Sequence, residues 1–429
     1  MWIDHANPLY LGIDFGTSGA RAMAIDTAGS LHAQVSHRFT SSPVQNLATD
    51  WQQTLFALIE QIPSQQRRQI QAIALDGTSS TVLLCDATGT PLEHPLLYND
   101  GRGIVVMDQI RAIAPPEHIV LSATSSLAKL LWFSQQSYFH NAAYFLHQAD
   151  WLAFLLHGKL GISDYHNSLK VGYDVERLGY PAWLRSLSFF HLLPKVLAPG
   201  TSVAIVKSEV ADRLGLPANC QIKTGTTDSI AAFLASGATL PGEAVTSLGS
   251  TLVLKLLSRT RIEEERSGIY SHRLGNLWLV GGASNTGGAV LQQFFSPDKL
   301  AVLSAQIQSD QESPLRYYPL LQPGERFPLN DPNLPPCLEP HPQNPVEFLH
   351  GLLEGIARIE ALGYQRLQAL GADALTQVYT AGGGAANSAW TTIRARHLQV
   401  PVLRSPQMEA AYGAALLARG GWGGGEVKR

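Results

Sequence analysis

The chain has few cysteines, little net charge and no long apolar run. Its three cysteines, Cys85, Cys220 and Cys337, are far apart, and no C-x-x-C pair or Cys/His metal spacing accompanies them. This predicts free thiols in a reducing compartment, and we expect the cytoplasm. A net charge of −3 argues against broad electrostatic attraction to nucleic acid or an acidic membrane. No apolar run approaches the roughly 20 residues of a membrane helix, and the first ten residues lack the basic and apolar regions of a signal peptide.

Length and composition predict more than one domain. The chain has 429 residues, 45% hydrophobic and 15% charged, which exceeds what one core usually accommodates. Apolar side chains from Leu47 to Ile62 recur on one helical face. Strand-like apolar segments surround this stretch, at residues 9–14, 20–25, 31–39, 70–76 and 81–85. The order of hairpin, third strand, helix and strand predicts an α/β layer.

A weaker copy of this order begins near Val245. A strand, a Gly-Ser-Thr turn and a second strand are followed by a strand at 277–282, a helical stretch at 349–359 and a strand at 377–384. The predicted fold class is therefore α/β, with two duplicated domains and a cleft between them where a ligand would bind. The proline-rich stretch 314–345 predicts an irregular connector.

The most informative segment is 9–25, LYLGIDFGTSGARAMAI. Two apolar strands flank a Gly-Thr-Ser-Gly turn, whose small residues, hydroxyls and amides suit an anion-binding concavity. Asp14 precedes this turn, where a carboxylate can hold Mg²⁺ directly or through water. The segment lacks the G-x-G-x-x-G spacing of dinucleotide-binding loops, and a strand follows it where those loops have a helix. It favours a phosphate-binding hairpin, with an ordinary glycine-rich hairpin as the alternative.

A second candidate site is the segment 224–229, TGTTDS. It follows the apolar Ile222 and precedes the helical run IAAFLA, so Asp228 is expected at a strand-to-helix turn. A carboxylate at such a turn can accept a proton from a hydroxyl nucleophile. The alternative is a helix N-cap, a position where aspartate is common.

Glycine-rich segments later in the chain suggest nucleotide contacts. Residues 247–251, SLGST, offer the same small donors as the first hairpin, and the two together suit a polyphosphate. Residues 381–390, AGGGAANSAW, place three glycines between a strand and a helix, and 281–288 is a similar loop. An adenine can lie on such bare backbone and contact Asn387 or Trp390. The alternative is close helix–sheet packing with Trp390 in the core.

Two other segments suit a polyol substrate. Residues 76–80, DGTSS, and 98–102, YNDGR, combine hydroxyls, carboxylates and a guanidinium. Sugars are bound by many directed hydrogen bonds, which these groups supply. For Asp100 and Arg102 the alternative is a structural ion pair.

Taken in this order, the motifs resemble those of the FGGY carbohydrate kinases, of the actin-like ATPase superfamily. The resemblance spans about residues 9–418. It rests on DFGTSGARA (14–22), KLLWFSQQ (129–136), HG (157–158), SDYHNS (163–168), GYD (172–174), TGTTDS (224–229), SLGST (247–251), GERFP (324–328) and AGGGAANSAW (381–390). It implies two actin-like ATPase (ribonuclease H-like) domains. We expect them at 1–235 and 236–429, with about the last 20 residues packed back on the first domain.

The resemblance also implies a phosphotransferase with an alcohol acceptor that uses ATP and Mg²⁺. Asp228 would be the catalytic base, and Asp14 would hold Mg²⁺ through water. The residues expected to bind the nucleotide and its phosphates are Asp14, Thr17, Ser18, Gly249, Ser250, Thr251, Gly383, Gly384, Asn387 and Trp390. Those expected to bind the sugar are Asp14, Ser18, Gly19, Ser79 and Asp228, with Asp100 and Arg102 as further candidates.

Within the family, the chain most resembles the short, xylulose-kinase-like cyanobacterial and plant kinases that act on D-ribulose. Residues 77–80 are GTSS where typical members have an M-H-G-type substrate motif, which counts against an ordinary D-xylulose kinase. The chain is also short for the family, with little room for lid insertions, so some futile ATP hydrolysis is expected.

We therefore expect phosphorylation of D-ribulose at its C5 hydroxyl. D-xylulose or another small polyol is the alternative substrate, and an ATP-binding regulatory protein with weak ATPase activity is the alternative class. The expected partner is a small-molecule sugar, with no nucleic acid or membrane partner, and the expected assembly is a monomer or homodimer.

Overall fold

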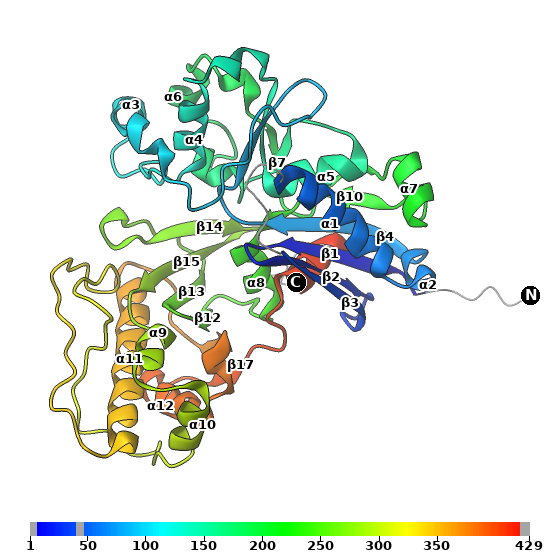
Figure 1. Ribbon diagram of the computed structural model, residues 1–429. Helices are drawn as coiled ribbons and strands as arrows, with labels where there is room; N and C mark the ends of the chain where they lie inside the picture. The colour runs from blue at the N-terminus through cyan, green and yellow to red at the C-terminus, as the bar shows by residue number, and fades with distance from the viewer. Residues whose placement is uncertain (1–6, 40–46, 421–429) are drawn as a thin grey trace, which may run out of the picture. The chain divides into compact units, whose positions relative to one another are not determined.

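The computed structural model describes residues 7–39 and 47–420. They form two compact units, each with its own sheet and core (Figure 1). Unit 1 comprises the described residues up to 235 together with 409–420, and unit 2 comprises 236–408. We expected about the last 20 residues to pack on the first domain. Of these, residues 421–429 lie outside the described residues.

Unit 1 is built on a seven-stranded sheet in the order β3-β2-β1-β4-β10-β9, with β11 also paired to β4. Its strands are β1 (Leu9–Phe15), β2 (Gly19–Ile25), β3 (Leu31–Arg38), β4 (Ile70–Gly77), β9 (Ser202–Ile205), β10 (Gln221–Lys223) and β11 (Thr226–Thr227). The first two form an antiparallel hairpin, whereas β4 runs parallel to β1, β10 and β11. The carboxyl ends of β1, β4 and β11 therefore meet at one edge of the sheet.

Helices cover both faces of this sheet. On one face α13 packs so closely on β1 that a Cβ at Gly12 would lie 1.9 Å from the Ala411 carbonyl oxygen. On the other, a Cβ at Gly77 would lie 2.9 Å from Gln148, the first residue of α5. The helices of unit 1 are α1 (Leu47–Gln61), α2 (Ser64–Arg67), α3 (Met107–Ile113), α4 (Ser126–Phe133), α5 (Gln148–His157), α6 (Ala182–Arg185), α7 (Ser208–Leu214), α8 (Asp228–Ala235) and α13 (Ala410–Gly420).

Two small sheets and a second core complete unit 1. The small sheets pair β5 (Val82–Cys85) with β6 (Tyr144–His147), and β7 (Ile162–Asp164) with β8 (Lys195–Leu197). The predicted strand at 81–85 thus exists but lies outside the main sheet. The second core gathers around α3 and α4, with Phe133 and Phe145 fully buried in it.

Unit 2 has a six-stranded sheet in the order β14-β15-β13-β12-β16-β17. Its strands are β12 (Glu243–Leu248), β13 (Leu252–Ser258), β14 (Tyr270–Leu274), β15 (Leu277–Ser284), β16 (Gln377–Ala381) and β17 (Val402–Arg404). Its helices are α9 (Gly288–Phe294), α10 (Pro297–Ser304), α11 (Pro345–Ala369) and α12 (Ser388–Leu398). The Asn344 side chain caps α11, and one apolar face of this long helix fills the core between α12 and the sheet.

The two sheets repeat one topology, which confirms the predicted α/β class with duplicated halves. In unit 1 the order β3-β2-β1-β4 contains two antiparallel neighbours and one parallel neighbour. In unit 2 the order β15-β13-β12-β16 contains the same pairings in the same sequence. The predicted connector between α10 and α11 has no helix or strand over 314–344 apart from isolated bridges.

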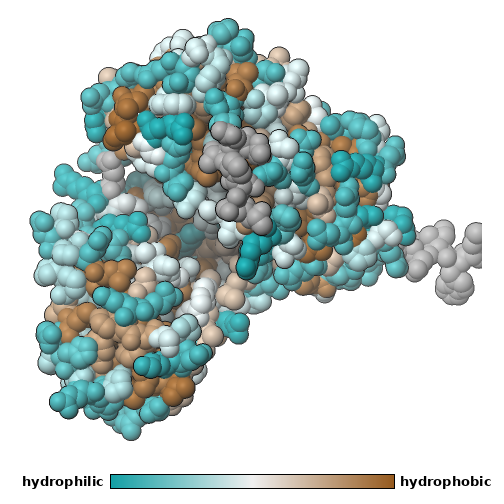
Figure 2. Space-filling model, viewed as in Figure 1, coloured by the Kyte–Doolittle hydropathy of each residue, from teal (hydrophilic) through white to brown (hydrophobic). Residues whose placement is uncertain are grey.

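The surface is mixed in character. Figure 2 shows hydrophilic residues over most of the visible face, with smaller apolar patches between them. None of the helices in the described residues combines the length and the apolarity needed to cross a membrane.

Candidate active site

Three carboxylates gather where β1, β4 and β11 end. Asp14 and Asp76 are cross-strand partners on neighbouring parallel strands, and Thr226 is the partner of Asp76 on its other side. Asp228 follows β11 directly and is the first residue of α8. The register of three parallel strands thus brings together residues that are far apart in the sequence, including the two predicted acids, Asp14 and Asp228.

Gly225 allows β11 to approach β4. A Cβ at this position would lie only 1.8 Å from the carbonyl oxygen of Leu75, a backbone atom that cannot move aside. Glycine is therefore required for Thr226 and Thr227 to pair with β4. This pairing fixes the start of α8, where the Asp228 carboxylate accepts a hydrogen bond of 2.6 Å from the Ser229 N–H.

The carboxylates influence one another electrostatically. Burial raises the pKa of Asp14, a hydrogen bond with Asp76 opposes that shift, and the charge of Asp228 adds to it. Burial and the neighbouring Asp14 raise the pKa of Asp76 well above its ordinary value. Arg21, the cross-strand partner of Asp14, lies 3.9 Å from it and is the nearest cation in the described ion pairs.

These residues fit a divalent cation. Asp14 is 5% exposed and Asp76 is fully buried. No donor of the described residues reaches either carboxylate oxygen of Asp76. A hydrogen bond between the two carboxyl groups therefore requires that one of them is protonated. Mg²⁺ prefers oxygen ligands and is often held by one or two carboxylates together with substrate phosphates and water. No cluster of three or more potential ligands occurs among the described residues, so these carboxylates do not enclose an ion by themselves, and phosphate oxygens and water would have to complete its coordination.

The tip of the β1–β2 hairpin offers free donors. Gly16 closes the turn by donating to the Gly19 carbonyl oxygen at 3.0 Å. Thr17 and Ser18 are exposed, and no acceptor in the described part of the chain takes their backbone N–H groups. The hairpin therefore presents amides and hydroxyls to solvent beside Asp14, as an anion-binding turn requires.

A pocket of about 630 Å³ opens beside this hairpin within unit 1. Its polar wall includes Thr17, Thr78 and Gln148, and its apolar wall includes Phe39 and Trp51. The Gln148 side-chain oxygen accepts from both the N–H and the hydroxyl of Thr78, at 3.0 and 3.2 Å. Such a mixture of a few fixed polar groups and an apolar wall is typical of small-molecule sites.

The pocket differs from the predicted sugar site in its residues. Thr78 lines it, whereas Ser79, the next residue, does not. The other predicted sugar ligands, Asp14, Ser18, Gly19 and Asp228, are likewise absent from its lining, although Gly16 and Thr17 of the same hairpin belong to it. The predicted sugar ligands and the pocket lining therefore share the β1–β2 turn and the loop after β4 but no side chain.

Lys129 holds two walls of the pocket in place. Its side chain is fully buried, and its ammonium nitrogen donates to the carbonyl oxygens of Ser80, at 2.7 Å, and Leu97, at 2.6 Å. Burial lowers the pKa of Lys129 to about 7. The lysine of the K-x-x-W motif thus joins α4 to the loop after β4 and to the segment before Tyr98.

Asp100 and Arg102 form an ion pair, the alternative that sequence analysis left open. The Arg102 Nε donates to the Asp100 carboxylate at 2.9 Å, and its guanidinium lies over the Trp132 ring, 4.7 Å from the centroid. Both residues line a smaller pocket of about 320 Å³.

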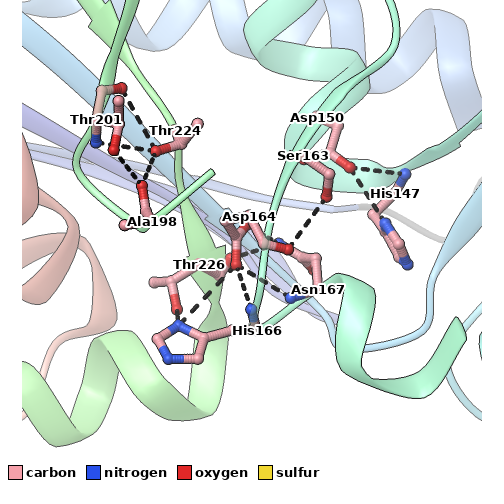
Figure 3. A network of polar contacts seen from close by, with 10 residues as sticks. All are labelled: His147, Asp150, Ser163, Asp164, His166, Asn167, Ala198, Thr201, Thr224 and Thr226. Carbon is pink, nitrogen blue, oxygen red and sulfur yellow. Dashed lines mark hydrogen bonds and ion pairs between the residues drawn. The ribbon is translucent and has the colours of Figure 1, made fainter. Parts of the chain in front are cut away.

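A buried polar network supports β11 (Figure 3). The His166 ring contacts the Thr226 hydroxyl at 2.7 Å, and the Asn167 amide donates to the Thr226 carbonyl oxygen at 3.2 Å. Asp164 accepts from the backbone N–H groups of both His166 and Asn167. Burial, reinforced by the charge of Asp150, raises the pKa of Asp164 to about 7. This network holds the strand that ends at Asp228.

In unit 2, the β12–β13 turn carries the second predicted phosphate motif. Gly249 and Thr251 are half-buried and Ser250 is exposed. The loop after β15 packs on this turn, since Gly288 donates to the Gly249 carbonyl oxygen at 2.8 Å and Ala289 to that of Ser250 at 3.1 Å. A Cβ at Gly287, where φ is +147°, would collide with Ser250 and Thr251.

The glycine turn after β16 lies against the same hairpin. Gly382 has φ +84°, and a Cβ there would lie 2.7 Å from the Leu248 carbonyl oxygen. Gly383 is exposed and Gly384 half-buried, so bare backbone is accessible at this turn.

Asn387 and Trp390 have structural contacts at the start of α12. The Asn387 side chain caps the helix by accepting from the Trp390 N–H at 3.0 Å, and its amide donates to Ser304 at 2.8 Å. Trp390 is 2% exposed and belongs to the core. The structure therefore agrees with the alternative left open by the sequence, Trp390 in the core, and the ring supports the turn, 2.8 Å from where a Cβ of Gly384 would lie.

Sequence reasoning placed Asp76 and Thr78 in a candidate polyol segment, and His166 and Asn167 in a motif of the resemblance, but it gave none of the four residues a role of its own. Asp76 ends an apolar strand just as Asp14 does, and this parallel was the available signal. The contacts of His166 and Asn167 with β11 depend on long-range packing, so the motif at 163–168 marked the segment but not its partner.

Comparisons with known proteins agree with this geometry. The model of the N-terminal domain of the FGGY family of carbohydrate kinases matches residues 9–235, and that of the C-terminal domain matches 244–421. The xylulose kinases of Escherichia coli (strain K12) and Bacillus subtilis (strain 168) are 24% and 23% identical to the chain. Each alignment covers 96% of this chain, with 90% and 88% of the relative.

Solved structures share the fold. A xyloylose kinase from Brucella ovis superposes with a TM-score of 0.81 at 24% identity, covering 96% of this chain and 90% of that one. Plasmodium falciparum glycerol kinase, determined with ADP, also has a TM-score of 0.81, at 16% identity and with coverages of 96% and 89%. Because the two domain models together match most of the described residues, the chain belongs to the FGGY family of carbohydrate kinases, ATP-using phosphotransferases with an alcohol acceptor.

Proposed function

We propose that this protein transfers the γ-phosphoryl group of ATP to the terminal C5 hydroxyl of a pentulose, with D-ribulose as the first candidate. The observation that carries the proposal is the position of Asp228. It follows β11 at the sheet edge where Asp14 also ends its strand, in the unit that holds the 630 Å³ pocket.

Asp228 would accept the proton of the attacking hydroxyl and orient its oxygen toward the γ-phosphorus. Phosphoryl transfer depends chiefly on positioning and charge stabilisation, because its transition state is loose. The β11 pairing and the contacts of His166 and Asn167 with Thr226 support this role, since they hold the strand from which Asp228 extends. Thr78 and Gln148 line the pocket that would receive the sugar, with Ser18, Gly19 and Ser79 adjoining it in the chain.

Asp14 would hold Mg²⁺ through water, and the bound ion would neutralise charge on the phosphate oxygens. The exposed N–H groups of Thr17 and Ser18 would donate to phosphate oxygens, as would Gly249, Ser250 and Thr251 of unit 2. The accessible backbone at Gly383 and Gly384 would receive the adenosine, with Asn387 and Trp390 supporting that turn from below.

Two observations favour different sugars. The named relatives are xylulose kinases, which supports D-xylulose as the second candidate. Against it, residues 77–80 are GTSS, so Thr78, bonded to Gln148, lines the pocket where an M-H-G-type motif would supply other groups. A pocket built to hydrogen-bond one hydroxyl arrangement discriminates strongly against a mismatched one.

The test is ADP release from Mg·ATP, measured with and without D-ribulose, D-xylulose, L-ribulose, glycerol and erythrulose. Strong stimulation by D-ribulose, with 5-phosphate as the product, is the expected result. Stimulation by D-xylulose alone would replace the substrate but keep the reaction. Sugar-independent ATP hydrolysis without stimulation by any of the five would count against the kinase and favour an ATP-binding regulatory protein.

A further inference from the structure

We propose that Glu325 is a positioning residue that sets the shape of the phosphate-binding hairpin of unit 2. This proposal rests on the nucleotide role proposed above for Gly249, Ser250 and Thr251. Glu325 is not part of that hairpin and lies in the proline-rich stretch between α10 and α11. It acts through residues 285–289, the loop that follows β15 and the first two residues of α9.

Glu325 is buried and fully occupied as an acceptor. Its side chain is 2% exposed. One carboxylate oxygen accepts from the Ser284 hydroxyl at 2.5 Å and the Tyr318 hydroxyl at 3.0 Å. The other accepts from the Asn285 N–H at 2.8 Å and from the N–H groups of its own two successors in the chain. A buried carboxylate with this many donors is a fixed anchor, because each bond to a charged group is stronger than a neutral one.

Phe327 anchors the same segment by packing. Its ring is fully buried, and a Cβ at Gly282 of β15 would lie 2.8 Å from it. A Cβ at Gly363 of α11 would also lie 2.8 Å from this ring. The segment 324–328 therefore holds the last residues of β15 with two side chains, the Phe327 ring and the Glu325 carboxylate.

The anchored loop in turn holds the hairpin. Leu252, the first residue of β13, donates to the Thr286 carbonyl oxygen at 2.8 Å. Gly288 and Ala289 donate to the carbonyl oxygens of Gly249 and Ser250. Gly249 and Ser250 thus accept hydrogen bonds from the segment that Glu325 fixes. Thr251 precedes Leu252, which donates to the same segment.

A purely structural role would produce a different pattern, and unit 2 contains a matched control. Glu354 of α11 is also fully buried and has several partners, His350, Arg358, Arg396 and His397, but none of these belongs to the hairpin or to residues 285–289. Loss of either carboxylate should destabilise unit 2, but only loss of Glu325 should alter the hairpin.

The experiment compares wild type, Glu325→Ala, Glu325→Gln and Glu354→Ala by calorimetric ADP binding, thermal unfolding and amide hydrogen exchange. For Glu325→Ala we expect ADP affinity to fall by roughly 10- to 100-fold, the range found when residues that orient metal ligands are removed. We also expect faster exchange at the amides of Leu252, Gly288 and Ala289. Glu325→Gln, which keeps one acceptor oxygen, should bind within about fivefold of wild type, the factor for a single neutral hydrogen bond.

Glu354→Ala should lower the unfolding temperature and leave ADP affinity and these amides unchanged. Wild-type ADP affinity in a folded Glu325→Ala variant, or equal effects of both alanine variants on binding, would overturn the positioning role. If Glu325→Ala does not fold, Ser284→Ala, which removes one of the five donors, replaces it and should shift ADP affinity in the same direction. Failure of the wild-type protein to bind ADP would instead overturn the proposed nucleotide function itself.

Discussion

At the scale of single residues, Asp228 is the side chain on which the proposed chemistry depends. Asp228→Asn keeps the size of the side chain and an acceptor for the Ser229 N–H, so we expect an intact fold. Removal of a general base lowers turnover by roughly 10²- to 10⁴-fold. Steady-state kinetics should show this loss in kcat, while calorimetry shows ADP binding within error of wild type. Sugar phosphorylation at an undiminished rate would remove Asp228 from the mechanism.

Lys129 gives a second prediction at this scale. Lys129→Met keeps the length of the side chain but leaves the carbonyl oxygens of Ser80 and Leu97 without their donor. An unsatisfied buried polar group costs about 1–3 kcal/mol, so the free energy of unfolding should fall by about 2 kcal/mol or more. Urea unfolding measures this change. The half-buried Lys207, whose partner is the exposed Glu209, is the control, and Lys207→Met should change stability little.

The sequence predicts residue types at the candidate site more readily than their surroundings. Asp14 and Asp228 were selected from a local pattern, an apolar segment beside small residues, and their roles stay predictions. For Trp390 the sequence left contact with an adenine and a place in the core both open, because the face of α12 that meets the core depends on α11 and the sheet. Asp76 was given no role of its own, because its place beside Asp14 follows from a register set by two strands about 60 residues apart.

At the scale of elements, the closest packing in unit 1 lies between β1 and α13. A Cβ at Gly12 would collide with backbone atoms of Ala411 and Ala415, so Gly12→Ala must displace the helix. Overpacking of this kind costs about 1–3 kcal/mol, and more where backbone must move. Thermal unfolding should show the loss. Gly101→Ala is the control, since nothing lies within 4 Å of its Cβ position and its φ of −96° suits alanine. Equal stability of the two variants would contradict the observed packing.

Elements were predicted more reliably than their partners. The strands at 9–14, 20–25 and 70–76 and the helix at 47–62 appear within a few residues of their predicted bounds, because each has a clear apolar period. The segment 81–85 is also a strand, but it pairs with β6 rather than with the main sheet. Its apolar pattern resembles that of a central strand, and its pairing depends on β6, about 60 residues later in the chain.

At the scale of the whole molecule, acid should weaken the protein partly through Glu354. Burial alone would raise the pKa of this carboxyl, but hydrogen bonds from His350, His397 and Arg396 outweigh burial and hold the pKa well below its ordinary value. A carboxyl with a lower pKa in the folded than in the unfolded state stabilises fully above its ordinary pKa, and this contribution is lost as pH falls.

Glu354→Gln isolates that contribution. The difference in unfolding free energy between wild type and Glu354→Gln should be largest near neutral pH and shrink below about pH 5. Urea unfolding at a series of pH values measures it. A difference that stays constant down to about pH 3 would mean that the carboxylate does not gain its stability from these hydrogen-bond partners.

Unit 1 is assembled from both ends of the described chain. β1 precedes all of unit 2 in the chain, whereas α13, which covers Gly12, follows unit 2. During synthesis the face of β1 that carries Gly12 therefore remains without this helix while all of unit 2 is being made. A nascent chain that ends before α13 should expose this face to chaperones, and native protection of β1 should appear only after α13 has been released.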